Sequence, residues 1–203
     1  MQSASKIKRL FAIILVFAGM PGWKFAQAEQ ADQVRSDWYP IPSGSQFLTG
    51  DSWSFNTVTY RLYGGQSCIR GTTCRNSNDK TRDCGEASLG ILVSLIRDLK
   101  PLCRTAAEDV PLRTRHVFCM AVMREGTAAG TRIDLGTALI TQGFGFAARR
   151  ADGSIVHPAY GVAEDQARRQ KAGLWAFPDL PNPTAIIAQT MQGRAPAPTQ
   201  PAH

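Results

Sequence analysis

Histidine is scarce in this sequence, and none of its three histidines stands in a pattern typical of a catalytic or metal site. No His, Cys and Asp residues form a recognisable metal-binding cluster, and no serine and histidine follow a known catalytic order. His116, the only histidine within a predicted strand, is expected on the surface of the fold. The absence of an internal repeat argues against a solenoid or a propeller.

A hydrophobic run long enough to span a bilayer comfortably is also missing. The N-terminal apolar run, Leu10–Met20, is too short for that role. Three basic residues between positions 6 and 9 precede it, and Ala26 and Ala28 place small residues where signal peptidase cleaves. We therefore expect residues 1–28 to be a signal peptide and the mature protein to be periplasmic or secreted. The alternative is an uncleaved membrane anchor.

Loss of the signal peptide changes the charge of the protein. Residues 1–28 hold four basic side chains and no acidic one, so their removal lowers the formal net charge from +7 to +3. A net charge of +3 neither demands nor excludes a polyanionic partner. The remaining chain, about 175 residues, has the size of one domain with its own core.

Cysteine is present in an odd number. All five cysteines lie between residues 68 and 119, which fits export to an oxidising compartment. One cysteine must stay free or pair with another chain, and the spacing alone does not give the connectivity.

Composition divides the mature chain into three parts. Residues 29–46 are a polar lead-in, 47–178 carry the patterns of a folded domain, and 179–203 are a Pro/Ala-rich tail that we expect to be flexible. The tail lacks the hydrophobic spacing of a core element.

Hydrophobic periodicity predicts a mainly β domain with helices, of the α+β class. Strands are expected at two places within 47–55 and at 58–63, 102–105 and 115–123; helices at 86–99, 135–142 and 159–172; and a loop at 64–83. Five short strands with about three helices favour a five-stranded barrel of the oligonucleotide/oligosaccharide-binding (OB) kind.

The most informative stretch is 58–69, Val-Thr-Tyr-Arg-Leu-Tyr-Gly-Gly-Gln-Ser-Cys-Ile. It resembles the core of the staphylococcal nuclease (thermonuclease) family, in which such a strand ends in Arg-Leu-Tyr-Gly-Ile-Asp-Ala-Pro-Glu. The turn at Gly50-Asp51, the segment that begins at Asp134 and the ending Gly173-Leu174-Trp175 resemble further family segments in the same order. The resemblance covers about residues 50–177 and implies a staphylococcal nuclease-like OB fold.

The resemblance also implies a site chemistry. Family nucleases hydrolyse phosphodiesters with a bound Ca²⁺, a general base and two arginines. Arg61 matches the first arginine and Asp51 one metal-binding aspartate, whereas Gln66 replaces the second aspartate and Ile69 replaces the general-base Glu. An amide brings no charge to a metal and isoleucine accepts no proton, so any Ca²⁺ would be held weakly.

Two of these matches have alternatives. The second arginine is either Arg113, which keeps the five-residue Asp-x-Tyr-Gly-Arg spacing from Asp109, or Arg115, which fits the alternation of the next strand. Asp51 is alternatively a turn-forming residue without a ligand, and Arg61 an ordinary solvated side chain.

Disulfide pairs follow from the resemblance as well. Exported family members often carry one pair that matches Cys74 and Cys84 and a second that matches Cys103 and Cys119, which leaves Cys68 unpaired. Alternatively, Cys68 bonds to Cys74 or Cys84.

The loss of the base and of one metal carboxylate predicts a pseudoenzyme that is inactive or at most weakly active. The phrase from Tyr60 to Gly71 further resembles thermonuclease-like proteins associated with succinoglycan (exopolysaccharide) biosynthesis in rhizobia. We therefore expect an envelope role and an acidic polysaccharide or a nucleic acid as partner, bound through an arginine-bearing barrel face. The alternative is an active metal-dependent DNA or RNA nuclease with a non-standard ligand set.

Overall fold

The computed structural model describes residues 37–75, 80–124, 126–127 and 129–191. The predicted signal peptide, residues 29–36 of the polar lead-in and the last twelve residues of the predicted tail lie outside these ranges. None of the helices in the described ranges has the length and apolar character needed to cross a bilayer.

A curled sheet carries the fold, with the strand order β1-β8-β9-β4-β3-β2 and with β10 added against β9. The strands are β1 (Tyr39–Pro40), β2 (Gln46–Thr49), β3 (Ser52–Phe55), β4 (Val58–Leu62), β8 (Leu102–Asp109), β9 (Thr114–Val122) and β10 (Arg132–Asp134). β4 and β9 are parallel neighbours, although most pairs are antiparallel, and this pairing sets Arg61 opposite His116.

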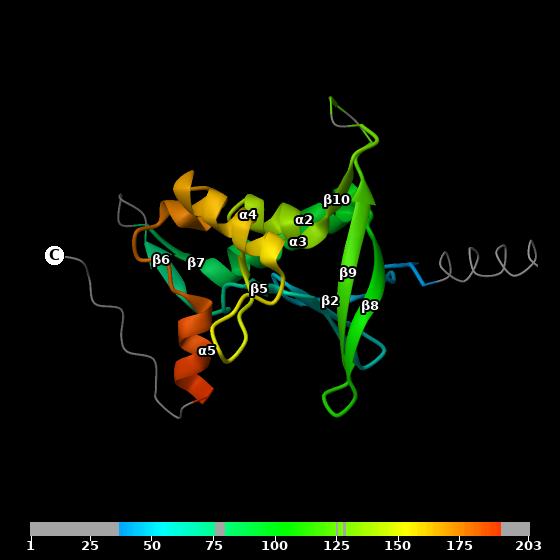
Figure 1. The fold of residues 1–203 in the computed structure, drawn as a ribbon, viewed down its shortest axis with the longest axis horizontal. Helices are drawn as coiled ribbons and strands as arrows, with labels where there is room; N and C mark the ends of the chain where they lie inside the picture. Colours follow the sequence, from blue (N-terminus) through cyan, green and yellow to red (C-terminus); the bar gives the residue numbers. More distant parts are fainter. Residues whose placement is uncertain (1–36, 76–79, 125, 128, 192–203) are drawn as a thin grey trace, which may run out of the picture. The chain divides into compact units, whose positions relative to one another are not determined.

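Two small two-stranded sheets and several helices complete the described chain. They are β5 (Gly65–Ser67) with β11 (Gly145–Ala147), β6 (Thr73–Arg75) with β7 (Thr81–Asp83), α2 (Cys84–Leu99), α3 (Leu135–Thr141), α4 (Pro158–Arg169), the 3₁₀ turn η1 (Gly173–Ala176) and α5 (Pro183–Met191). Figure 1 shows α2, α3 and α4 grouped beside the curled sheet, and α5 standing apart from that group.

Local chemistry explains where the helices begin and end. The carboxylate of Asp83 accepts a hydrogen bond from Glu86 N (3.0 Å) and caps α2, and Asp134 accepts one from Thr137 N (2.7 Å) and caps α3. Gly143 follows α3 with a φ of 78°, a left-handed conformation that glycine adopts without steric cost. Asp134 and Gly143 thus bound the helix predicted at 135–142.

The core lies between the sheet and α2. Trp53 and Tyr60 stack with their ring centroids 6.0 Å apart, and Leu92 of α2 is fully buried in the same cluster. Cys103 and Cys119 face each other in register on β8 and β9 and form a disulfide. This predicted pair is confirmed.

The structure is therefore a mixed α and β fold built on a curled sheet, and the helices and strands predicted from periodicity are present with shifted ends. Three segments differ from expectation. The lead-in contributes β1, which pairs with β8; the predicted loop at 64–83 holds β5, β6 and β7; and the predicted tail contains α5.

Each of these differences has a physical reason. β5, β6 and β7 have three residues each, too few for an alternating pattern to be visible. Helix α5 has a local start signal, because the Asn182 side chain accepts a hydrogen bond from Ala185 N (3.2 Å) and Pro183 occupies the first helical position. The Pro/Ala-rich composition of residues 179–203, in contrast, is typical of a flexible tail.

Candidate functional site

Arg61 is the centre of the site that the sequence indicated. It lies on β4 between β3 and β9, and its side chain is 38% exposed. Leu62 and Tyr60, its neighbours along the strand, are buried in the core, so alternation turns Arg61 to the other face of the sheet.

Asp51, in the tight turn between β2 and β3, is the buried partner of this arginine. Its Oδ1 accepts hydrogen bonds from Thr49 Oγ1 (2.6 Å) and Ser67 Oγ (2.8 Å). Its Oδ2 lies 2.9 Å from Arg61 Nε without a well-directed hydrogen bond, so this contact is an ion pair. The Arg61 guanidinium thus compensates the charge of the Asp51 carboxylate, and the two hydroxyl donors fix the carboxylate inside the protein.

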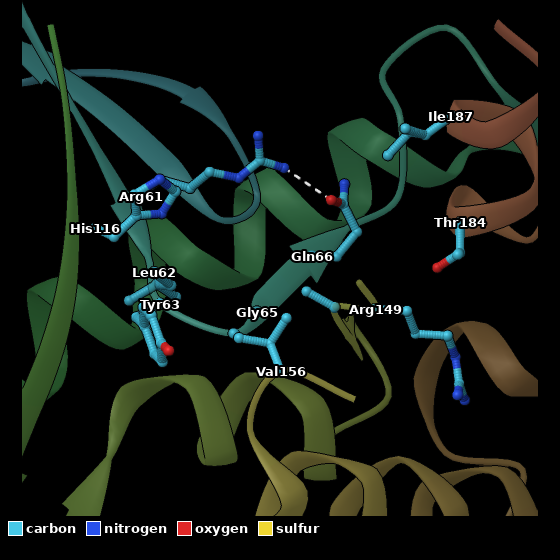
Figure 2. A pocket seen from close by; sticks show the side chains of 12 residues that line it. Arg61, Leu62, Tyr63, Gly65, Gln66, His116, Arg149, Val156, Thr184 and Ile187 are labelled. Carbon is cyan, nitrogen blue, oxygen red and sulfur yellow. Dashed lines mark hydrogen bonds between the residues drawn. The ribbon is translucent and has the colours of Figure 1, made fainter. Parts of the chain in front are cut away.

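Gln66 holds the other side of the Arg61 guanidinium. Its Oε1 accepts a hydrogen bond from Arg61 Nη2 (2.8 Å), and its Nε2 donates to the backbone oxygen of Ser67 (3.0 Å). Figure 2 shows Arg61 reaching across to Gln66, with the bond drawn as a dashed line. Among the described residues, Nη1 of Arg61 has no hydrogen-bond or ion-pair partner.

These contacts test whether Ca²⁺ fits the site. A cation at Oδ2 of Asp51 would lie beside a guanidinium only 2.9 Å from that oxygen and would be repelled by it. The amide oxygen of Gln66, the other expected ligand, already accepts from Arg61. No group of three or more His, Cys, Asp and Glu side chains within the described ranges could hold a metal ion. The donor set does not fit Ca²⁺.

Neither Ile69, at the position expected for the general base, nor the nearby Glu86 replaces that base. Ile69 carries no ionisable group, and the nearby Glu86 pairs with Arg70, with Arg70 Nη2 2.5 Å from Glu86 Oε1. Glu86 therefore serves an exposed ion pair at the start of α2.

A cavity of about 380 Å³ opens beside Arg61. Arg61, Gln66 and His116 line it from the sheet side, Arg149 from the turn after β11, and Thr184 and Ile187 from α5. In Figure 2, Thr184 and Ile187 face Arg61 and Gln66 across the opening, while the Arg149 side chain extends away from Arg61.

The two candidates for the second arginine lie elsewhere. Arg113 sits in the turn between β8 and β9 with a φ of 49°, and Arg115 Nε lies 2.9 Å from Oε1 of Glu108, in an ion pair whose members are both about half exposed. Neither residue lines the cavity beside Arg61. Arg149 and His116, which do line it, were not selected from the sequence as site residues.

No pattern in the sequence marks His116 or Arg149 as part of this site. His116 joins the site only because β4 and β9 pair in parallel, a contact between distant segments that periodicity does not reveal. Arg149 joins it only because the turn after β11 lies against the same opening.

A scan against protein-family models finds no match for this chain, and a search of curated proteins finds none either. The residues of this site are therefore the observations on which a proposed function rests.

The remaining cysteines form a second feature of interest. Cys68, Cys74 and Cys84 are free and buried, and they pack in one cluster with Phe146 and Leu174. The predicted Cys74–Cys84 bond is not formed in the structure, where the Cys84 thiol interacts with both of the other thiols.

Proposed function

We propose that this chain is an exported, non-catalytic binding protein of the staphylococcal nuclease-like OB type, and that it binds an acidic polysaccharide through Arg61. The curled sheet and the sequence resemblance support the OB assignment. Export follows from the N-terminal pattern and agrees with the Cys103–Cys119 disulfide.

The observation that carries the proposal is the fixed position of the Arg61 guanidinium. Asp51 contacts Nε and Gln66 contacts Nη2, so two of the three nitrogens are held by the protein. Nη1 is left for a ligand, and the fixed side chain loses little conformational entropy when one binds. An anchored arginine of this kind suits recognition of a carboxylate.

The same contacts argue against the family reaction. A nuclease of this type needs a free metal-binding carboxylate, yet Asp51 is paired with the arginine that would otherwise bind the phosphate. Ile69 stands where the base is expected, and loss of a positioned base alone costs about 10² to 10⁴ in rate.

The lining of the cavity favours a carboxylated polymer over single-stranded nucleic acid. Nucleic-acid grooves commonly present exposed aromatic rings on which bases stack. Apart from His116, Tyr63 is the only aromatic residue that the described part of the chain contributes to the lining, and its ring packs against Phe118 with centroids 4.9 Å apart. Arginine, a histidine and the hydroxyl of Thr184 are instead suited to sugar carboxylates and hydroxyls.

Isothermal titration of the mature protein tests this proposal. The ligands are a carboxylated polysaccharide such as succinoglycan, neutral dextran and single-stranded DNA, at low and high salt. We expect saturable binding to the carboxylated polymer only, weakened by salt because charges are paired. Equal binding to dextran, or tighter binding to DNA, would contradict it.

Variants locate the binding site. Arg61→Lys keeps the charge but loses the planar fork, and we expect at least about a tenfold loss of affinity from one charged hydrogen bond. The matched control is Arg97→Lys on α2, where Arg97 pairs with the exposed neighbouring Asp98 far along the chain from the cavity lining. Equal affinities of the two variants would exclude Arg61 as the anchor.

A further inference from the structure

Three buried thiols meet where the end of β5, strand β6 and the first turn of α2 come together. Cys68 follows β5 directly, Cys74 lies in β6, and Cys84 is the first residue of α2. Each side chain is at most 1% exposed. The proposed binding function gives these thiols no role.

Cys84 occupies the middle of this cluster. Its thiol interacts with the thiols of both Cys68 and Cys74. Contacts with Thr72 fix the arrangement. The backbone N of Cys84 donates to Thr72 O (2.9 Å), and Cys68 Sγ lies 3.4 Å from the hydroxyl oxygen of Thr72. Cys74 is held on its own side by a contact of 3.7 Å from its Sγ to Arg82 O.

The start of α2 also packs unusually closely on the segment that carries Cys68. A Cβ at Gly85 would overlap the backbone of Arg70, so only glycine allows this approach. The helix also packs closely on the turn between β2 and β3, where a Cβ at Gly50 would lie 2.5 Å from the Cβ of Ser88 in α2. The close approach at Gly85 keeps the first turn of α2, which carries Cys84, against the segment that carries Cys68.

We propose that Cys84 is the shared partner of two alternative disulfides, Cys74–Cys84 and Cys68–Cys84, which interconvert by thiol–disulfide exchange. Within the described residues, no group of side chains that could hold a metal ion includes these cysteines. The closeness of the three thiols suits disulfide chemistry. The proposal does not depend on the polysaccharide ligand.

Oxidation of the cluster and exchange within it are two separate steps. A low-molecular-weight disulfide such as glutathione disulfide first oxidises two thiols of the cluster and is itself reduced to two thiols. In the exchange step, the Cys68 thiolate attacks Sγ of Cys84, the Cys68–Cys84 bond forms, and the Cys74–Cys84 bond breaks. Cys74 leaves as a thiolate and takes a proton from solvent, so the exchange consumes no oxidant.

The reduced cluster contains thiols of unequal acidity. The hydrogen bond with Cys84 lowers the pKa of the Cys68 thiol, although burial and the nearby Asp83 carboxylate oppose this effect, and burial raises the pKa of Cys74. In the reduced cluster, Cys68 is therefore the thiol that ionises most readily and attacks an external disulfide first.

Peptide mapping of the full mature protein tests the proposal. The protein is equilibrated in buffers of reduced and oxidised glutathione, quenched with acid, alkylated and digested without reduction. We expect Cys84 in every cluster disulfide, and both Cys74–Cys84 and Cys68–Cys84 among the products. A Cys68–Cys74 bond with Cys84 alkylated, or a cluster that stays fully reduced while Cys103–Cys119 oxidises, would overturn the inference.

Two matched variants separate the alternative bonds. Cys74→Ser should form Cys68–Cys84 and Cys68→Ser should form Cys74–Cys84, with the Cys103–Cys119 bond as the internal check of folding. Failure of either folded variant to form its bond contradicts a shared Cys84. In the wild-type protein, samples oxidised to different ratios of the two bonds should converge on one ratio at pH 8 without glutathione, at a constant total of disulfides. Samples that keep their starting ratios would exclude exchange.

Discussion

Arg61 and Arg115 lie on neighbouring strands and each pairs with a carboxylate 2.9 Å away, yet the two ion pairs differ in their surroundings. Asp51, the partner of Arg61, is 1% exposed and also accepts from two hydroxyl groups, whereas Glu108, the partner of Arg115, is 48% exposed. A buried partner fixes an arginine, and an exposed partner does not. Only the first arrangement prepares a side chain for a ligand.

The largest expected effect comes from removing Arg61. Arg61→Ala leaves the buried Asp51 carboxylate without its countercharge, and we expect the free energy of unfolding to fall by about 2–3 kcal/mol. This figure is below that for a fully buried pair, because the Arg61 side chain is 38% exposed and the hydroxyl donors remain. Urea denaturation followed by circular dichroism measures the change.

The double variant Asp51→Asn/Arg61→Ala sharpens this result. Since no buried charge is left unpaired, it should be more stable than Arg61→Ala alone. A double variant as unstable as the single one would show that packing, rather than charge, accounts for the loss.

The second effect concerns α5. A chain ending at residue 182 lacks Thr184 and Ile187, which form one wall of the cavity, and we expect a severalfold loss of affinity for the carboxylated polymer. Titration calorimetry measures it. The control is a chain ending at residue 191, which keeps α5 and should bind as the full mature protein does. If both truncations bind equally, α5 makes no contact with the ligand.

The third effect is that of Arg115. Arg115→Ala removes an exposed ion pair with Glu108 and a hydrogen bond with Tyr60, and we expect the free energy of unfolding to fall by at most about 1 kcal/mol, of which the ion-pair part disappears at high salt. Affinity for the polysaccharide should stay within a factor of about two, since exposed pairs contribute little. A loss equal to that of Arg61→Ala would remove the contrast between the two pairs.

The smallest expected effect is a difference between Cys68 and Cys74 in the pH at which their thiols are alkylated. In the reduced protein, alkylation of Cys68 should reach half its maximal rate at a pH below the ordinary thiol pKa of about 8.5, because the hydrogen bond with Cys84 lowers its pKa. Cys74, whose pKa is raised by burial, should reach that point at a higher pH. Rates are measured by peptide mapping, and identical profiles would contradict the assignment.

Local chemistry made part of this structure predictable. The capping carboxylate of Asp134, the stop at Gly143 and the buried alternation of β4 act within a few residues, so the sequence displays them directly. The Cys103–Cys119 bond was expected from the family resemblance and agrees with the register of β8 and β9.

The remainder depends on contacts between distant segments. The parallel pairing that sets His116 beside Arg61, and the approach of Thr184 to the same cavity, leave no periodic trace in the sequence. Asp51 had two interpretations from sequence, turn residue or metal ligand. Its burial against Arg61, Thr49 and Ser67 now supports a structural role that no spacing rule could have distinguished.

The most direct test of the central claim is a nuclease assay on the mature wild-type protein. Single-stranded DNA and RNA are incubated with it in Ca²⁺, Mg²⁺, Mn²⁺ or EDTA, and the products are separated by length. We expect no metal-dependent shortening of either substrate, because Asp51 is paired with Arg61 and Ile69 cannot act as a base. Robust Ca²⁺-dependent cleavage that Arg61→Lys abolishes would contradict this account.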